Sequence, residues 1–201
     1  LIGVAGPDAR SALARAGLEA PADAMSSTEN AQGAVLSLSS QRFIAVIPAN
    51  EVASAWAALT ALARPAGRIA WQWLDIQEGL PLICEATKEA FVPQMADFDR
   101  IGGVSFHKGC YPGQEIVART QYLGKVKRHL FRVSAEVDIK AGDVLHSPGN
   151  PDQSVGMIMS SAPAPTGGFA GLAVIQSNFA DDVHLAAIDG PKLLAIAVNP
   201  A

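Results

Sequence analysis

The sequence predicts an α+β fold in which an α/β unit is followed by a small antiparallel β-barrel. Helical and strand-like apolar patterns alternate up to about residue 80, whereas short strand-like runs separated by turn signals fill residues 125–201. Between them, residues 81–124 show little periodicity and many glycines and prolines. A long irregular segment in a compact domain is usually functional. With 201 residues, 49% of them hydrophobic, the chain can bury one large core or two small ones.

The first region, residues 1–80, is predicted to alternate strands and helices. Gly6-Pro7-Asp8 is typical of a helix start, with proline near the first helical position and an acid where the helix dipole favours it. Gly17 is a typical helix end, and Asn50 is expected to cap a second helix. The expected elements are a strand at 1–5, a helix at 9–16, a polar loop at 21–33, strands at 35–38 and 43–47, a helix at 52–63 and a strand at 69–76. This β-α-β-β-α-β order is that of a ferredoxin-like unit.

The third region, residues 125–201, is predicted to form the barrel. Pro148-Gly149-Asn150-Pro151 and Thr166-Gly167-Gly168 are strong turn signals between its strands. The expected strands are 129–133, 144–145, 155–159, 171–175, 183–188 and 193–198.

Composition excludes several classes of protein. The net charge of −4 argues against a dedicated nucleic-acid binder, and the basic run from Lys125 to His129 is too short to change that. Two cysteines without CxxC spacing give neither a disulfide framework nor a four-cysteine zinc or iron–sulfur site, so we expect a reducing cytoplasm and no metal site. No run of 18 apolar residues exists to span a membrane.

The chain begins without methionine, inside the apolar run Leu1-Ile2-Gly3-Val4-Ala5. It has no signal-peptide architecture. We therefore expect that the N-terminal part of a longer protein is missing.

The strongest functional signal is the run Lys108-Gly109-Cys110-Tyr111-Pro112-Gly113-Gln114-Glu115, which continues to Arg119. Glycine beside Cys110 leaves its sulfur sterically open, and Lys108, with His107 when protonated, favours the nucleophilic and metal-binding thiolate. Cys84, in an apolar run, is expected to be an inert core thiol. The remaining histidines show no metal-ligand spacing and are interpreted as surface or half-buried side chains: His129, His146 and His184.

The run around Cys110, with Val117-Ala118-Arg119, resembles the signature of the YgfZ family of folate-binding proteins. These are relatives of the T-protein (aminomethyltransferase) of the glycine cleavage system. The resemblance implies a three-domain fold that binds tetrahydrofolate. It also implies a role in assembling or repairing iron–sulfur clusters, including those of enzymes that thiolate transfer RNA. Other stretches that support it are 1–10, 71–81, 91–94 and 102–106.

The resemblance also implies roles for particular residues. Cys110 is then the functional thiol and Lys108 its neighbour, while Trp71 contacts folate, because a planar indole can stack on a pterin. Relatives usually read Glu-Ala-Gly where this chain has Gln77-Glu78-Gly79, so Glu78 is displaced by one position, which on a strand reverses the side-chain direction. The implied partners are folate and iron–sulfur assembly or client proteins, without direct nucleic-acid or membrane binding. The other implied cofactor-binding residues are Gln114, Glu115 and Arg119.

Three functions stay open at this point. The first is a folate-binding accessory factor for iron–sulfur proteins, and the second is an aminomethyl- or methyltransferase that uses tetrahydrofolate. The transferase needs an acid or base beside the pterin, and the expected missing N-terminal part could hold it. The third is a partner-binding module that docks through the barrel. The Lys-Gly-Cys-Tyr motif, which a T-protein does not need, favours the first.

Overall fold

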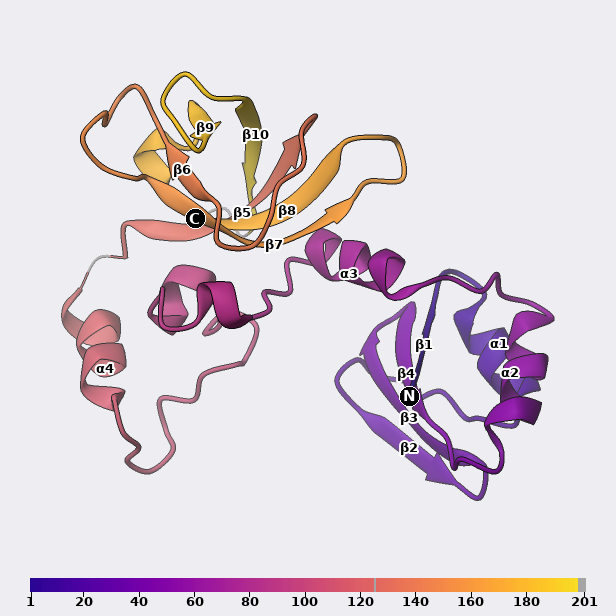
Figure 1. The fold of residues 1–201 in the computed structure, drawn as a ribbon. Coiled ribbons are helices and arrows are strands. Elements are labelled where there is room, and N and C mark those ends of the chain that lie inside the picture. Colours follow the sequence, from indigo (N-terminus) through magenta and orange to yellow (C-terminus); the bar gives the residue numbers. More distant parts are fainter. Residues whose placement is uncertain (125, 199–201) are drawn as a thin grey trace. The chain divides into compact units, whose positions relative to one another are not determined.

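The computed structural model describes residues 1–124 and 126–198 (Figure 1). The chain divides into two compact units, Leu1–Gly67 and Arg68–Ala201. The α+β class is confirmed, because a four-stranded antiparallel sheet with helices precedes a closed six-stranded antiparallel barrel. None of the helices in the described part of the chain is long and apolar enough to cross a membrane.

In the first unit, two helices cover one face of an antiparallel sheet of order β1-β4-β3-β2 (Figure 1). Apolar side chains from both layers share one core, in which Val4, Leu13, Phe43 and Leu59 are buried. The helix that follows Gly6-Pro7-Asp8 ends before Gly17, as predicted, and Gly17 has a positive φ of 72°. The bounds are β1 Ile2–Ala5, α1 Ala9–Arg15, β2 Ser27–Asn30, β3 Gly33–Ser39, β4 Arg42–Val46 and α2 Val52–Thr60.

Two local predictions for this unit are wrong. The predicted loop at 21–33 contains β2, whose polar residues are mostly exposed and pair with β3 through the backbone, for example Thr28 with Val35. Because β2 is an edge strand with polar, mostly exposed side chains, its sequence shows none of the apolar alternation by which a strand is recognised. The residue that caps α2 is Glu51 rather than Asn50, and its side chain makes no capping hydrogen bond.

The predicted strand at 69–76 is also wrong, because Arg68–Gln77 forms helix α3. The ferredoxin-like order therefore loses its last strand. Ile76 is buried and Trp73 packs beside it against the barrel, three residues apart as on a helix face. Gly79, at a φ of 68°, ends the helix, with hydrogen bonds from its N–H to Ile76 and from the N–H of Leu80 to Asp75. This pair of bonds is a Schellman motif, which explains why a glycine stands there.

The second unit is built on the predicted barrel, and all six expected strands are found. Its strand order is β10-β5-β8-β7-β6-β9, with all neighbours antiparallel. Helix α3 packs on β7 and β8, where the side-chain amide of Gln72 donates to the carbonyl of Ser161 at 2.9 Å. The bounds are β5 Arg128–Ala135, β6 Val144–His146, β7 Gly156–Pro163, β8 Phe169–Gln176, β9 Val183–Leu185 and β10 Lys192–Ala197, with a 3-10 turn η3 at Ser177–Phe179.

The segment between α3 and the barrel contains two short 3-10 turns and one helix. These are η1 Glu85–Thr87, η2 Pro93–Ala96 and α4 Gln114–Leu123. The turn η2 packs on β5, and α4 packs on η2. The Cys110 loop is therefore connected to the barrel through α4, which packs on η2, and through η2, which packs on β5.

Candidate functional site

The loop that carries Cys110 leads directly into α4. Gly113 precedes the first helical residue and has a φ of 81°, a left-handed conformation that glycine adopts without strain. The backbone N–H of Tyr111 donates to Oε1 of Gln114 at 3.2 Å, and the N–H of Gln114 donates to the carbonyl of Tyr111 at 3.3 Å. These two reciprocal bonds close the turn and fix where the loop enters the helix.

Cys110 is exposed, as predicted for a reactive thiol. The ammonium of Lys108 lies 4.5 Å from the centre of the Tyr111 ring, within the range of a cation–π contact. This contact spans Cys110, because Lys108 and Tyr111 stand on either side of it in the sequence. The loop therefore presents an exposed thiol close in sequence to a lysine and a tyrosine whose side chains contact each other.

Helix α4 is anchored by Gln94, a residue of η2 with only 3% of its surface exposed. Its Nε2 donates a hydrogen bond of 2.8 Å to the carbonyl of Val117, which is the buried residue of α4. Oε1 of the same amide is buried without a hydrogen-bond partner among the described residues. The sequence marked Phe91-Val92-Pro93-Gln94 only as part of the family resemblance, and nothing in its pattern assigned this role.

A buried carboxylate attaches the same segment to the barrel. Asp97 is 1% exposed, and its Oδ1 lies 3.3 Å from Nδ1 of His129 at the start of β5. The other ring nitrogen of His129 lies 3.2 Å from the carbonyl of Val126. Sequence spacing could not find this pair, because 32 residues separate its members. His129 was predicted to be a surface or half-buried side chain; it is half-buried, and the structure adds its carboxylate partner.

Cys84 is not the core thiol that the sequence predicted. It is half-buried, follows the exposed Leu82 and Ile83, and caps the turn η1. Its sulfur lies 3.6 Å from the hydroxyl of Thr87, and this side-chain hydrogen bond lowers the pKa of the Cys84 thiol. The apolar run failed as a burial signal because its side chains point into solvent.

Trp71 and Glu78 lie on and just beyond α3. Trp71 is half-buried and Glu78 is exposed, and the N–H of Glu78 still donates to the carbonyl of Leu74 in a helical bond of 3.0 Å. Seven residues are close to two helical turns, so both side chains start from the same face. The strand argument for Glu78 is therefore wrong: one position along a helix turns the side chain by about 100° instead of reversing it.

The predicted site residues fall into two groups with different supports. Trp71 and Glu78 belong to α3, which packs on β7 and β8. Cys110 and Lys108 belong to the loop, which α4 and η2 support. The three predicted residues of α4 differ in exposure, since Gln114 is half-buried in the turn while Glu115 and Arg119 are exposed.

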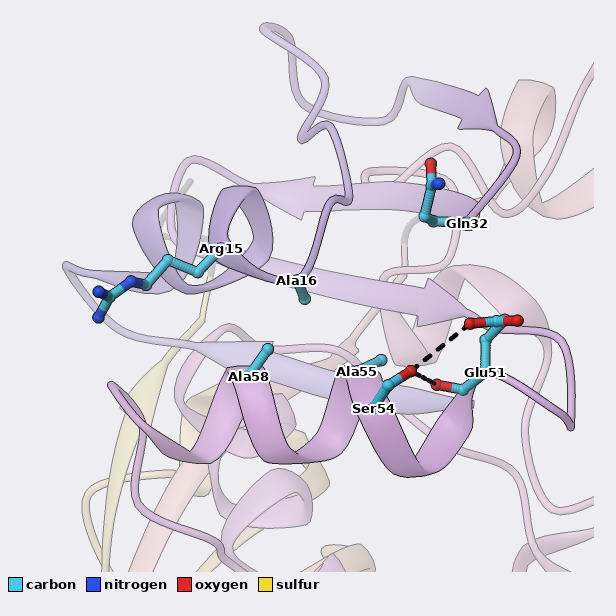
Figure 2. A pocket seen from close by; sticks show the side chains of 7 residues that line it. All are labelled: Arg15, Ala16, Gln32, Glu51, Ser54, Ala55 and Ala58. Carbon is cyan, nitrogen blue, oxygen red and sulfur yellow. Dashed lines mark hydrogen bonds between the residues drawn. The ribbon is translucent and has the colours of Figure 1, made fainter.

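A pocket of roughly 280 Å³ lies in the first unit, which contains none of the predicted site residues. Figure 2 shows that α1 and α2 form its sides, with Gln32 from the β2–β3 turn. The backbone carbonyl and side chain of Glu51 accept hydrogen bonds from the Ser54 hydroxyl, at 2.8 and 3.5 Å. Two of the polar residues that line the pocket, Glu51 and Ser54, are thus hydrogen-bonded to each other. Its lining residues are Arg15, Ala16, Gln32, Glu51, Ser54, Ala55 and Ala58.

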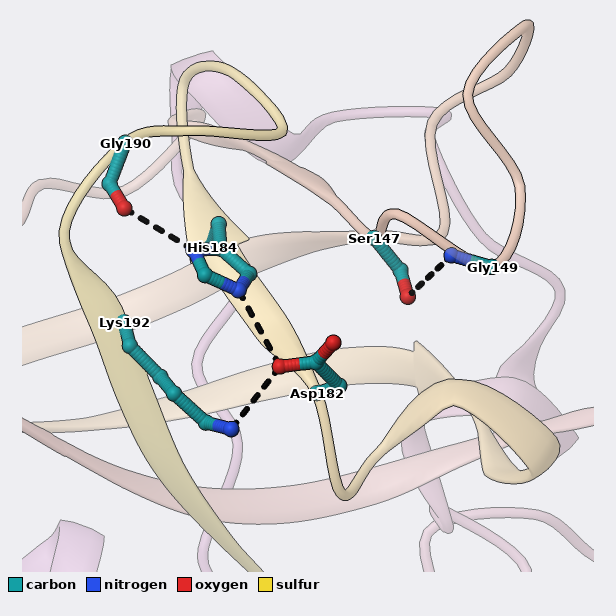
Figure 3. Close-up of polar contacts among 6 residues, drawn as sticks. All are labelled: Ser147, Gly149, Asp182, His184, Gly190 and Lys192. Atoms are coloured by element: carbon teal, nitrogen blue, oxygen red, sulfur yellow. Dashed lines mark hydrogen bonds and ion pairs between the residues drawn. The ribbon is translucent and has the colours of Figure 1, made fainter.

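A polar cluster joins β9 and β10 of the barrel (Figure 3). Asp182 Oδ1 lies 3.1 Å from Nε2 of His184 and 2.8 Å from Nζ of Lys192, and both contacts lower the pKa of Asp182. The other ring nitrogen of His184 lies 2.9 Å from the carbonyl of Gly190. Because both ring nitrogens are engaged, we assign this cluster a structural role. Within residues 1–124 and 126–198, no three His, Cys, Asp or Glu side chains come together as a metal site requires.

Comparison with known proteins decides the family. A curated protein of Yersinia pseudotuberculosis described as "tRNA-modifying protein YgfZ" is 32% identical over 205 residues, covering 100% of this chain and 62% of that protein. A protein of Edwardsiella ictaluri with the same description is 37% identical over 156 residues, or 76% of this chain and 47% of its own length. The chain belongs to the YgfZ family. It spans about 62% of the length of the first of these YgfZ relatives.

The fold of this YgfZ-family chain has a structural counterpart. A crystal structure of the glycine cleavage system aminomethyltransferase T from Bartonella henselae superposes with a TM-score of 0.67 and covers 96% of this chain and 56% of that one. The two sequences are 18% identical, so the likeness establishes a shared fold. No protein-family model matches the chain.

Proposed function

We propose that the protein is a tetrahydrofolate-binding accessory factor for iron–sulfur cluster assembly or repair, including the clusters of enzymes that modify transfer RNA. The observation that carries the proposal is the exposed Cys110, presented on a closed glycine turn in a member of the YgfZ family. A thiol that served only packing would be buried. The relatives' description as tRNA-modifying proteins supports the link to transfer RNA.

Cys110 acts in this proposal as a transient ligand or a thiol-exchange group. A thiolate is the form of cysteine that binds iron or attacks another sulfur, and it must reach its target. Iron–sulfur clusters are usually held by four thiolates. Among the described residues, no three His, Cys, Asp or Glu side chains come together as a metal site requires. In this proposal a partner protein therefore provides the other ligands.

Trp71 and Glu78 suit one end of a folate. The pterin is a flat ring with N–H donors along one edge, and an indole can stack on such a ring while a carboxylate accepts from its donors. Both side chains start from the same face of α3 and its extension, which is the arrangement that joint recognition requires. Tetrahydrofolate, when bound, would carry a one-carbon unit.

The test is a Cys110→Ser variant of the full-length protein, introduced into cells that lack the wild-type protein. We expect the activity of an iron–sulfur enzyme and the thiolation of transfer RNA to fall to the level of the deletion. The fold should be unaffected, because an exposed loop thiol contributes little to packing. Cys84→Ser is the matched control and should retain activity. Full activity of Cys110→Ser would remove Cys110 from the function.

A further inference from the structure

Helix α4 leaves large apolar side chains in solvent. Ile116 is 61% exposed, Tyr122 is 69% exposed and Leu123 is 85% exposed, whereas Val117 is buried against η2. Ile116 and Leu123 are seven residues apart, so they lie on one side of the helix, two turns from each other. A surface helix normally has one apolar stripe, and it faces the core. This helix has a second stripe that the described part of the chain does not cover.

The sequence around this stripe is strongly basic. From Arg100 to Arg128 the chain has six lysines and arginines and a single acidic residue, Glu115, although the whole chain has 15 basic and 19 acidic residues. Arg100 is exposed, and so are three further cations that lie before, within and after the helix in the sequence. Lys108 precedes it, Arg119 stands between Ile116 and Leu123, and Lys127 follows its end. Apolar side chains flanked by cations complement a partner surface that has an apolar centre and acidic residues around it.

We propose that α4 is the docking surface for an acidic protein partner and seats that partner beside Cys110. This inference rests on the proposed function and names the partner surface that it requires. A ten-residue helix is about 15 Å long, and the loop with Cys110 enters at its first turn. A partner held on Ile116 and Arg119 therefore has its own sulfur or metal ligands within reach of the Cys110 thiol.

The exposed aliphatic groups favour a protein over RNA as the occupant. Single-stranded RNA is held by cations together with aromatic side chains on which bases stack. Of the three exposed apolar side chains of α4, only Tyr122 offers a ring for stacking, whereas the burial of Ile116 and Leu123 would stabilise a protein interface. Outside residues 100–128 the chain has more acidic than basic residues, so it offers no extended basic surface to a phosphate backbone.

The experiment uses a synthetic amphipathic peptide with leucines on one face, glutamates on the other and a terminal cysteine activated as its thionitrobenzoate disulfide. The Cys110 thiolate attacks the peptide sulfur, a Cys110–peptide disulfide forms, and thionitrobenzoate leaves with the electron pair of the broken bond. No further oxidant is needed. Absorbance of the released thionitrobenzoate gives the rate. Full-length protein in which every cysteine except Cys110, Cys84 included, is replaced by serine reports Cys110 alone, and a peptide of shuffled sequence gives the undocked rate.

Docking raises the local concentration of the peptide at Cys110, so the amphipathic peptide should react at least about tenfold faster than the shuffled one. The double variant Ile116→Ser, Leu123→Ser should lose that advantage, and Arg119→Glu with Lys127→Glu should lose most of it. All four side chains are exposed, so the fold should tolerate these changes. The matched control is Leu194→Ser with Ile196→Ser on β10, which removes two apolar side chains that are 64% and 55% exposed and should keep the full rate.

Equal rates for the two peptides, or an advantage that survives the α4 changes, would overturn the docking surface. So would tight binding of a transfer RNA transcript that depends on Arg119 and Lys127 while the peptide gains no advantage, because the surface would then serve nucleic acid. The proposed function is judged separately by Cys110→Ser in cells. Loss of activity there, with flat peptide rates here, would retain the function and remove only this surface.

Discussion

Gln94 donates a 2.8 Å hydrogen bond to the carbonyl of Val117, and this buried contact joins η2 to the middle of α4. Three residues further along, Asp97 pairs with His129 on β5 at 3.3 Å. One short segment thus holds the Cys110 loop on one side and the barrel on the other. A reactive group works best when rigid elements position it. The segment that carries the exposed Cys110 is therefore attached to the barrel by polar contacts of two buried side chains, Gln94 and Asp97.

The Gln94 contact can be tested with Gln94→Leu, which keeps the volume of the side chain and removes its donor. We expect a loss of about 1 kcal/mol in the free energy of unfolding, typical of one hydrogen bond, and faster hydrogen exchange in residues 108–123. Gln72→Leu is the matched control, because it breaks the bond to Ser161 on β7 instead. Unchanged exchange in residues 108–123 would mean that other contacts hold α4.

Asp97 combines a buried carboxylate with a left-handed backbone, at a φ of 54°. Asparagine adopts this conformation readily and keeps an acceptor for His129. Asp97→Asn should therefore cost little, whereas Asp97→Ala should lose about 2–3 kcal/mol from the strained φ and the missing acceptor. Denaturant unfolding measures both. Equal losses for the two variants would show that the charge, which only aspartate carries, dominates.

The sequence predicted the barrel well because its strands are bounded by clear turn signals, such as Thr166-Gly167-Gly168 before β8. It also located the Cys110 loop, since glycine, lysine and cysteine together suit no core. Helix α3 was misread because Trp71 and Trp73 alternate with a polar residue, which imitates a strand. Gly79 was the available signal for a helix end.

Other features were beyond any local pattern. The polar strand β2 is held by backbone pairing with β3, and the residues of Ser27–Asn30 carry no sign of it. The Asp97–His129 pair depends on how η2 meets β5, which only the tertiary fold decides. Burial of Cys84 was predicted from the apolarity of its neighbours, although a short turn can expose an apolar run.

We predict that the contacts of Asp182 make the stability of the fold depend on pH in the acid range. The hydrogen bonds from Lys192 and His184 lower the pKa of this carboxyl below its ordinary value of 3.8. A lowered folded-state pKa gives stability that is present above the unfolded value and is lost as the pH falls through the folded value. Asp182→Asn should thus unfold at a lower temperature than wild type at neutral pH, and the difference should shrink below about pH 4. Asp138→Asn controls for the loss of one exposed carboxylate. A gap that stays constant down to acid pH would contradict the assignment.

Trp71 is the side chain on which folate affinity should depend. Trp71→Ala removes a stacking surface that contributes on the order of 1 kcal/mol beyond burial, so tetrahydrofolate should bind the full-length protein several-fold to about tenfold more weakly. Calorimetric titration measures the dissociation constant directly. Trp56→Ala is the control, because Trp56 is an exposed indole on α2. An unchanged constant for Trp71→Ala would place the folate site elsewhere.

The two cysteines should react differently with an alkylating reagent under native conditions. Cys110 is exposed and should be labelled first, while the half-buried Cys84 should follow at a measurable rate instead of staying inert. The Thr87 hydroxyl lowers the pKa of the Cys84 thiol, so a larger fraction of it is thiolate at mildly alkaline pH. Thr87→Val keeps the shape of this buried side chain and removes the hydroxyl.

The variant should therefore move the pH midpoint of Cys84 labelling upward, toward the ordinary value of 9.0, and leave the profile of Cys110 where it was. Mass spectrometry of the two cysteine peptides after timed labelling across a pH series gives both profiles from one sample. The unchanged Cys110 profile is the internal control, since Thr87 belongs to η1 and the Cys110 loop is supported by η2 and α4. An unmoved Cys84 midpoint, or a shift of both profiles together, would show that the Thr87 hydrogen bond does not set the reactivity of Cys84.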